Sequence, residues 1–162
     1  MPEEWIIDGY NLLYSLPPGI SKLAFFEVLA NFTAGQAKSV LVVLDGHGNA
    51  EELASFCTDQ LKIVYAGTVS ADSVIERLLY NLTVGARHVV RLLKIRVVTD
   101  DRALAQMARG YGALVMGAKD FIQEIKIGER QSQESVSHKN IQMHGFNRPF
   151  HDKLNSWNKK LS

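Results

Sequence analysis

The chain alternates short apolar runs with longer segments in which apolar positions recur at helical spacing. Each short run is almost wholly apolar rather than alternating with polar residues, which is typical of strands buried on both faces of a parallel sheet. The pattern therefore predicts five strands, at Trp5–Asp8, Val40–Leu44, Leu61–Tyr65, Ile95–Thr99 and Ala113–Met116.

Helices are expected between these strands and after the last one. Their apolar stripes cover residues 20–30, 74–82, 102–110 and 121–127. Ser73 and Glu76 have the spacing of a capping box, and Gly110 and Gly112 predict the end of the third helix. Because strands and helices alternate, we predict one α/β domain, a three-layer sandwich with a mostly parallel central sheet flanked by helices.

The composition adds a cellular setting. The chain has 162 residues, of which 46% are hydrophobic and 22% charged, as in ordinary soluble proteins. Its one cysteine, Cys57, cannot form an internal disulfide, which fits a reducing cytoplasm. The apolar runs are far shorter than the roughly 20 residues of a membrane span, and no signal peptide is evident. We therefore expect a cytoplasmic protein that does not bind membranes.

Charge is distributed unevenly along the chain. Residues 1–125 hold 11 Lys and Arg against 14 Asp and Glu, whereas residues 126–162 hold 7 against 3. An acidic body with a basic tail suggests a cation site in the body and an anionic partner at the tail, or else a merely solubilising extension. We expect a domain of residues 1–127 and a polar extension of residues 128–162, partly disordered or docked on a partner.

Acidic residues follow the predicted strands at the ends where ligands bind. In open α/β sheets, ligands lie in the crevice beyond the carboxyl ends of the strands. Five acids fall at such ends or at the start of the next helix, with Glu76 one helical turn further on. They are Asp8, Asp45, Asp72, Asp100 and Asp101.

Each acid also has a local explanation. Asp8 and Asp45 precede glycines and suit turns, Asp72 favours a helix dipole, and Asp101 is a suitable helix N-cap. Four carboxylates sharing one crevice would nevertheless repel each other and raise each other's pKa. A divalent cation relieves that repulsion, and Mg²⁺ or Mn²⁺ prefers such oxygen ligands.

Other kinds of site fit the sequence less well. One cysteine and five scattered histidines do not suit zinc, and neither a phosphate-binding glycine loop nor a G-x-S-x-G motif is present. A receiver-type phosphorylation module would need a pair of acids at the first strand. An aspartyl phosphatase would need an acid at Tyr10. Cys57 has no evident base beside it.

Four segments together resemble the YacP-like branch of the NYN-domain proteins, within the wider PIN-like nuclease group. They are WIIDGYNLLYSLP, LVVLDGHG, YAGTVSADSVIERLL and VVTDDRALAQMARGYGALVMGAKDFIQEI. The resemblance runs from about residue 4 to residue 127, in the family's order, and does not extend beyond about residue 130. It implies a PIN-like fold and metal-dependent cleavage of RNA.

The resemblance also implies roles for individual residues. The implied catalytic residues are Asp8, Asn11, Asp45, Asp72 and Asp101. Asp8, Asp72 and Asp101 would hold the metal, and Asp45 would be an additional ligand or would support one. Asp100 occupies a position that is often Ser in the family, which leaves the division of labour between Asp100 and Asp101 open, with Asp101 preferred as ligand.

Substrate contacts are expected from neighbouring residues. Asn11 would orient a phosphate or the attacking water, and Arg102 is placed to reach a backbone phosphate. Tyr10 and Tyr14 could stack on bases or pack against the first helix. Arg77 could contact RNA or form a surface salt bridge, and Glu76 could support the ligands or lie on the helix surface. The basic run at residues 86–96 is a nucleic-acid track or a solvated helix face.

The sequence thus predicts an endoribonuclease that hydrolyses RNA phosphodiester bonds with one or two Mg²⁺ or Mn²⁺ ions. Single-stranded RNA or ribosome-associated mRNA is the expected substrate, and the basic tail could recruit a protein or the ribosome. The alternative is an RNA- or ribosome-associated binding module with the same fold and little activity. The oligomeric state, the target sequence and activity on DNA stay open.

Overall fold

The computed structural model describes residues 3–34, 36–84 and 94–139, with the backbone alone for residues 131–139. None of the helices in these ranges has both the length and the apolar composition needed to cross a membrane. The elements are β1 Glu3–Asp8, α1 Gly9–Tyr14, α2 Lys22–Thr33, β2 Lys38–Leu44, α3 Ala50–Ala54, β3 Leu61–Tyr65, α4 Ala71–Val84, β4 Lys94–Val98, α5 Arg102–Gly110, β5 Leu114–Met116 and α6 Ala118–Lys139.

The five strands form one parallel sheet in the order β3-β2-β1-β4-β5. Asp8, the last residue of β1, pairs with Val43 of β2, and Ile7 pairs with Val98 of β4. The carboxyl ends of the three central strands therefore lie level at one edge of the sheet. The predicted α/β class with a parallel central sheet is confirmed.

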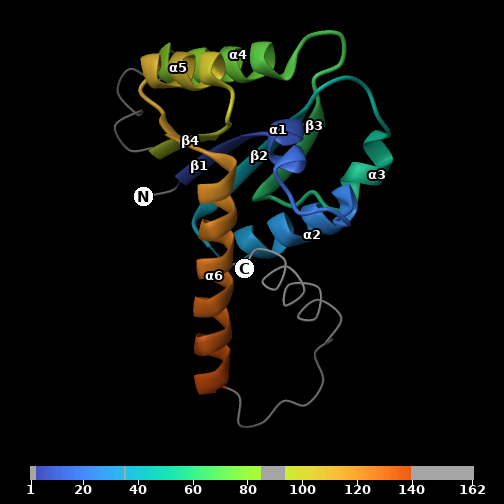
Figure 1. The fold of residues 1–162 in the computed structure, drawn as a ribbon, viewed down its shortest axis with the longest axis vertical. Helices are drawn as coiled ribbons and strands as arrows, with labels where there is room; N and C mark the ends of the chain where they lie inside the picture. Colours follow the sequence, from blue (N-terminus) through green and yellow to red (C-terminus); the bar gives the residue numbers. More distant parts are fainter. Residues whose placement is uncertain (1–2, 35, 85–93, 140–162) are drawn as a thin grey trace.

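Helices cover both faces of the sheet (Figure 1). Successive residues of β1 point to opposite faces. Trp5 and Ile7 join a core cluster with residues of α1, α2 and α6. Ile6 joins a second cluster with residues of α4 and α5. Because β1 is buried on both faces, its sequence is apolar throughout, and its end is held rigidly at the centre of the molecule.

The predicted helices are present, but one helix start was placed wrongly. The α4 helix begins at Ala71, so Ser73 is inside it and is not its cap. The hydroxyl of Ser70 instead accepts the backbone N–H of Ser73 at 3.1 Å, as an N-cap residue does. The short helices α1 and α3 were not predicted, because five or six residues are too few to show a helical period.

The last helix is longer than its apolar stripe. It was predicted over residues 121–127, whereas α6 runs for 22 residues, from Ala118 to Lys139. The stretch after Gly128 is polar but rich in Glu, Arg, Gln and Lys, which are good helix formers, so it continues the helix although its sequence has no apolar stripe. Residues 140–162 lie outside the described residues, and the domain division at residue 127 stays a prediction.

Candidate functional site

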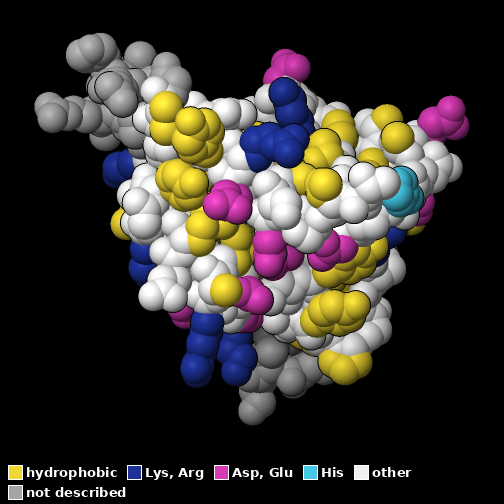
Figure 2. All heavy atoms as spheres, turned by 90° about the horizontal axis from the view of Figure 1, so that it is seen from above, with side chains coloured by type: hydrophobic (Ala, Val, Ile, Leu, Met, Phe, Trp, Pro, Cys, Tyr) yellow, Lys and Arg dark blue, Asp and Glu magenta, His cyan; other side chains and the backbone are white. Residues whose placement is uncertain are grey.

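Acidic side chains meet at the carboxyl edge of the sheet, as the strand order requires. Asp8 ends β1, Asp45 directly follows β2, and Asp101 lies at the start of α5, just beyond β4. Asp72 is in the first turn of α4. Seen from the side of α4 and α5, acidic side chains gather near the middle of this face (Figure 2). The topology therefore brings together four acids that are widely separated in the sequence.

Asp8 is the buried member of this group, with 7% of its surface exposed. The pKa of its carboxyl is raised to about 6, mainly by burial and, to a lesser extent, by the carboxylates of Asp72 and Asp45. Hydrogen bonds from the Thr99 hydroxyl, at 3.3 Å, and from the backbone of Asn11 oppose this rise. The charged form of Asp8 is thus disfavoured unless a cation compensates for it.

Asp72 connects the other acids electrostatically. Although its residue is exposed, partial loss of solvent raises the pKa of its carboxyl, and the carboxylates of Asp101 and Asp45 add to the rise. Asp72 and Asp45 also act on Asp8. The four carboxylates therefore form one repulsive group, as the sequence analysis anticipated for acids that share a crevice.

Two of the acids are fixed by helix N-termini. The backbone N–H of Ala71, at the start of α4, donates to Oδ1 of Asp45 at 2.8 Å. The backbone N–H of Leu104 in α5 donates to Oδ1 of Asp101 at 2.9 Å, so Asp101 is the N-cap of that helix. Capping occupies one oxygen of each carboxylate and sets the direction of the other. Asp101 can therefore be both the N-cap of α5 and a member of the acidic group.

Asp100 has different surroundings from Asp101. Its Oδ1 accepts the backbone N–H of Ala118, at the start of α6, at 3.1 Å. Its Oδ2 accepts the hydroxyl of Ser15 at 3.4 Å. Asp100 is not among the charges that raise the pKa of Asp8 or Asp72. The structure thus groups Asp101 with the other acids, while Asp100 joins the ends of α1 and α6.

Thr99 and Asn11 hold the turn after β4 against the end of β1. Thr99 is buried, accepts the backbone N–H of Asp101 at 3.1 Å and donates to Asp8. The side-chain oxygen of Asn11 accepts the backbone N–H of Asp100 at 2.8 Å. Sequence reasoning missed Thr99, although a polar residue at the end of an apolar strand was a visible signal. Asn11 was predicted to bind substrate, and its hydrogen bond shows that it also positions the turn after β4.

The predicted substrate-binding residues are on the helices that carry or follow the acids. Arg102 and Arg77 are exposed on α5 and α4, and neither pairs with an acid among the described residues. Tyr10 is half-buried against the core, and its ring centre is 6.3 Å from that of Tyr14, which is 87% exposed. Tyr14 therefore offers a ring to a ligand more freely than Tyr10 does. Glu76 is exposed on α4.

A further acid, which sequence reasoning missed, flanks Asp100. A Cβ atom on Gly117 would lie 3.0 Å from Oδ1 of Asp100 and 3.9 Å from Oδ2 of Asp120. Asp120 is in the first turn of α6, four residues after β5. The signal was an acid soon after the fifth predicted strand, in the segment VMGAKDF. Both carboxylates face the same glycine.

Gly9, by contrast, serves packing and not the crevice. A glycine directly after Asp8 suits a turn, and it would also keep a side chain away from a metal or substrate. A Cβ atom here would instead lie 2.5 Å from Cδ2 of Leu44 and 2.9 Å from the carbonyl oxygen of Val43. Gly9 therefore lets α1 begin directly against β2.

The donor set suits a hard divalent cation in its chemistry, because it consists of clustered carboxylates. Within the described part of the chain, however, no three His, Cys, Asp or Glu side chains are close enough to hold an ion together. Asp72 is exposed, and its carboxylate has no hydrogen bond within the described residues, so it can change rotamer. The electrostatics of the site thus favour a cation that the side chains do not yet enclose.

Comparisons with known proteins agree with this fold. Two crystal structures of Rae1 (YacP) from Bacillus subtilis, one of a mutant, are similar to the chain at 22% sequence identity. The mutant has a TM-score of 0.67 over 89% of this chain and 87% of its own. The other has a TM-score of 0.62 over 83% and 79%, respectively. No curated protein matches the chain significantly.

The family assignment extends over nearly the whole chain. The model of the YacP-like NYN domain matches residues 5–161, beyond the end of the resemblance visible in the motifs. The match includes every strand-end acid described above. The chain therefore belongs to the YacP-like NYN domain family.

Proposed function

We propose that this protein is a metal-dependent endoribonuclease that cuts RNA phosphodiester bonds with Mg²⁺ or Mn²⁺. The observation that carries the proposal is the group of four carboxylates at one sheet edge, in which burial and the neighbouring acids raise the pKa of Asp8 to about 6. The mutual repulsion of these carboxylates does not stabilise the fold, and a bound cation would relieve it. Membership of the NYN family supports a nuclease.

Asp8, Asp72 and Asp101 would hold the metal, and Asp45, which accepts a hydrogen bond from the start of α4, would be an additional ligand or would support one. Asp100 is a further candidate ligand at the neighbouring turn. When bound, the metal would activate a water molecule and neutralise charge on the phosphate oxygens. Whether one ion or two bind is a matter for metal titration.

The remaining residues of the site would position the acids and bind the substrate. The Thr99 hydroxyl keeps the Asp8 carboxylate in one rotamer, and Asn11 fixes the turn that carries Asp101. Arg102 and Arg77 would contact backbone phosphates, whose charge the acids would otherwise repel. Tyr14, with Tyr10 beneath it, would stack on a base.

The proposed substrate is single-stranded or ribosome-associated RNA in the cytoplasm. A formal net charge of +1 does not suit indiscriminate binding of nucleic acid, so the target would be delivered or structured. The basic segment after residue 139 is the proposed contact to the ribosome or another partner. Truncation after Lys139 leaves α6 whole and tests this: unchanged affinity for RNA and ribosomes would remove the idea.

The decisive experiment incubates single-stranded RNA and Mn²⁺ with the wild type and with Asp8→Asn and Asp101→Asn. We expect each substitution to lower cleavage by at least about 100-fold, since even residues that only support metal ligands contribute about 10–100-fold. EDTA should abolish cleavage by the wild type. Asp59→Asn, the same change at an exposed acid beside β3, is the matched control and should cleave normally.

Cleavage that persists in EDTA or in both variants would overturn the nuclease proposal. Tight binding of RNA without cleavage in Mn²⁺ would instead support the alternative, a binding module with the same fold. Thermal unfolding supplies a readout that does not depend on activity. Mn²⁺ should raise the Tm of the wild type and of Asp59→Asn but not that of Asp8→Asn, because only a ligand bound to the folded state stabilises it.

A further inference from the structure

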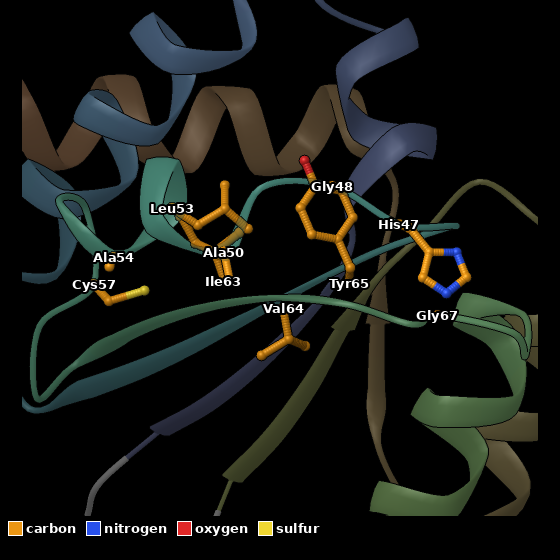
Figure 3. A pocket seen from close by; sticks show the side chains of 10 residues that line it. All are labelled: His47, Gly48, Ala50, Leu53, Ala54, Cys57, Ile63, Val64, Tyr65 and Gly67. Atoms are coloured by element: carbon orange, nitrogen blue, oxygen red, sulfur yellow. The ribbon is translucent and has the colours of Figure 1, made fainter.

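A pocket of about 470 Å³ lies between α3 and the edge strand β3 (Figure 3). Its size is within the range of pockets that bind small organic ligands, roughly 300–1,000 Å³. No acidic residue lines it. The side chains and backbone that shape it include His47, Gly48, Leu53, Cys57, Tyr65 and Gly67.

The walls of the pocket belong to the same loops that build the acidic site. His47 follows Asp45 by two residues, on the loop after β2. The backbone N–H of Gly67 donates to the carbonyl of Gly46 at 2.9 Å, which ties the loop after β3 to that loop. The loop after β3 then leads into α4 and Asp72. The pocket and the acidic site therefore share the loops after β2 and β3.

Tyr65 gives the pocket an aromatic wall with a fixed position. A Cβ atom on Gly48 would lie 2.0 Å from Cζ of Tyr65, so the phenol rests directly on the backbone of the β2 loop. Nζ of Lys22 donates to the Tyr65 hydroxyl at 3.1 Å. In Figure 3 the His47 ring lies at the Gly67 end of the pocket, beyond Tyr65. Two ring systems thus line one recess.

Lys22 supplies a cation beside this recess. It is the first residue of α2, and its ammonium also interacts with Tyr10 of α1 and with Glu52 of α3. Its hydrogen bond to Tyr65 is the main cause that raises the pKa of Lys22, so the group stays charged at neutral pH. Sequence reasoning passed over this lysine because 43 residues separate it from Tyr65. A cation held at the Tyr65 hydroxyl marks a place where a phosphate can bind.

We propose that this pocket binds the base of the nucleotide next to the scissile phosphodiester, with Lys22 contacting that nucleotide's phosphate. The inference rests on the proposed nuclease function and adds the place where the substrate is held. Aromatic walls accept every base by stacking, so the pocket would hold RNA without strict sequence selection. Binding energy would then come from a region outside the acidic site.

The single cysteine of the chain reports on this pocket, because Cys57 is exposed and lines it. The test measures the rate at which N-ethylmaleimide alkylates Cys57, with and without a single-stranded tetraribonucleotide, in EDTA so that nothing is cut. A bound base should slow alkylation in proportion to occupancy. Ribose 5-phosphate, which has no base, should protect far less.

Two matched pairs of variants separate the pocket from general charge effects. Ala54→Glu places a carboxylate in the pocket wall, and Ser55→Glu adds the same charge on the next exposed residue, outside the lining. We expect Ala54→Glu to weaken tetranucleotide binding about tenfold, the scale of losing one stacked base, and Ser55→Glu to have little effect.

Lys22→Met should lower the slope of log affinity against log salt by about 0.7, as loss of one phosphate contact on a single strand does. Lys38→Met, at the start of β2 and so at the opposite end of the sheet, is its control and should leave the slope unchanged. Equal effects of Lys22→Met and Lys38→Met would overturn the assignment of Lys22. Unchanged alkylation of Cys57 at the highest tetranucleotide concentration would overturn the pocket itself.

These results are separable from those for the nuclease. Metal-dependent cleavage without protection of Cys57 would remove the pocket proposal and leave the enzyme in place. Protection of Cys57 that Ala54→Glu abolishes, in a protein that cuts no RNA with any metal, would support the pocket and remove the enzyme.

Discussion

Asp8 is held in an unfavourable state by its surroundings. It is buried at the end of the central strand, faces two other carboxylates and has one hydroxyl, that of Thr99, to support its charge. A group whose pKa is raised to about 6 binds its proton more tightly in the folded protein than in the unfolded chain. At neutral pH the metal-free protein therefore loses stability to keep this carboxylate charged.

This gives a pH dependence with a defined sign. The stabilising contribution of Asp8 is fully present below its unfolded pKa, near 3.8, and is lost as the pH rises through about 6. In EDTA, Asp8→Asn should therefore raise the free energy of unfolding by about 1–3 kcal/mol at pH 7 and by little near pH 4. Urea unfolding between these pH values measures the difference.

Asp59→Asn controls for the change in net charge in the same series. A gain in stability for Asp8→Asn that is equal at both ends of the pH range would contradict the assignment, because it would not follow the titration of a carboxyl.

Junctions between strands and helices build the site at the level of elements. Acids that follow β2 and β4 accept backbone N–H groups from the starts of α4, α5 and α6. Each hydrogen bond anchors the start of a helix to the sheet edge and fixes the orientation of the carboxylate that accepts it. The first helix is joined differently: α1 begins at Gly9, in direct contact with β2, and carries Asn11 to the turn after β4.

The contact of α1 with β2 predicts a cost for Gly9→Ala. The added methyl would collide with Leu44 and with the carbonyl of Val43, so overpacking should lower the free energy of unfolding by about 1–3 kcal/mol. Gly110→Ala is the matched control, since a Cβ atom there meets nothing within 4 Å in helix α5. It should be neutral or stabilising by up to about 1 kcal/mol. Equal thermal shifts for both variants would contradict the packing role of Gly9.

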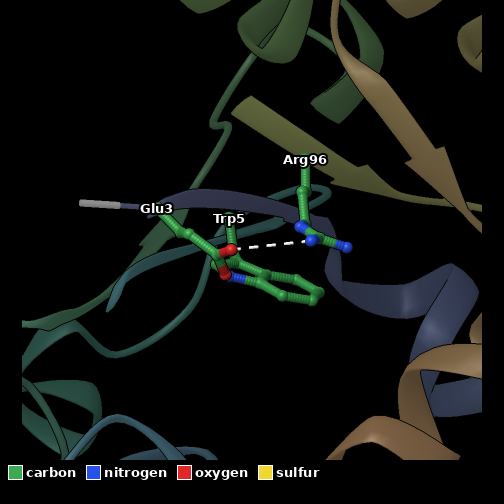
Figure 4. A network of polar contacts seen from close by, with 3 residues as sticks. All are labelled: Glu3, Trp5 and Arg96. Carbon is green, nitrogen blue, oxygen red and sulfur yellow. Dashed lines mark hydrogen bonds and ion pairs between the residues drawn. The ribbon is translucent and has the colours of Figure 1, made fainter. Parts of the chain in front are cut away.

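On the scale of the whole molecule, β1 connects the layers. The Trp5 ring packs against Phe32 of α2 and Phe121 of α6, with ring centres 5.9 and 5.4 Å away. The Arg96 guanidinium lies 5.0 Å from the ring and pairs with Glu3 at 3.5 Å (Figure 4). Trp5 therefore ties two helices and the neighbouring strand to the middle of β1.

Trp5→Ala should consequently lower the free energy of unfolding by about 3–5 kcal/mol, through the lost burial and the cavity that remains. Arg96→Met should change it far less, by about 1 kcal/mol in either direction. The ion pair is half-buried, Nε of Arg96 is buried without a hydrogen-bond partner, and Met keeps the contact with the ring. Chemical denaturation of both variants measures this. A larger loss for Arg96→Met would show that the pair, and not the ring, holds the layers.

Much of this fold was predictable because its strands are buried on both faces. Such strands appear in the sequence as continuous apolar runs, and the acids that follow them had to meet at one edge once the sheet was parallel. The length of α6 was not predictable from apolar periodicity, because its second half has no apolar stripe in the sequence. The helix start at Ser70 was missed because Ser73 offered an equally suitable cap.

The sequence by itself determined the five strands, the α/β class and the positions of the acids, since these depend on neighbouring residues and on one rule about parallel sheets. Only the tertiary structure decided that Asp101 faces the other acids while Asp100 turns to α6, that Thr99 supports Asp8, and that Gly9 serves packing. It also decided that Lys22 meets Tyr65. These facts depend on contacts between residues far apart in the chain, whose distances follow from strand order and packing and leave no local pattern.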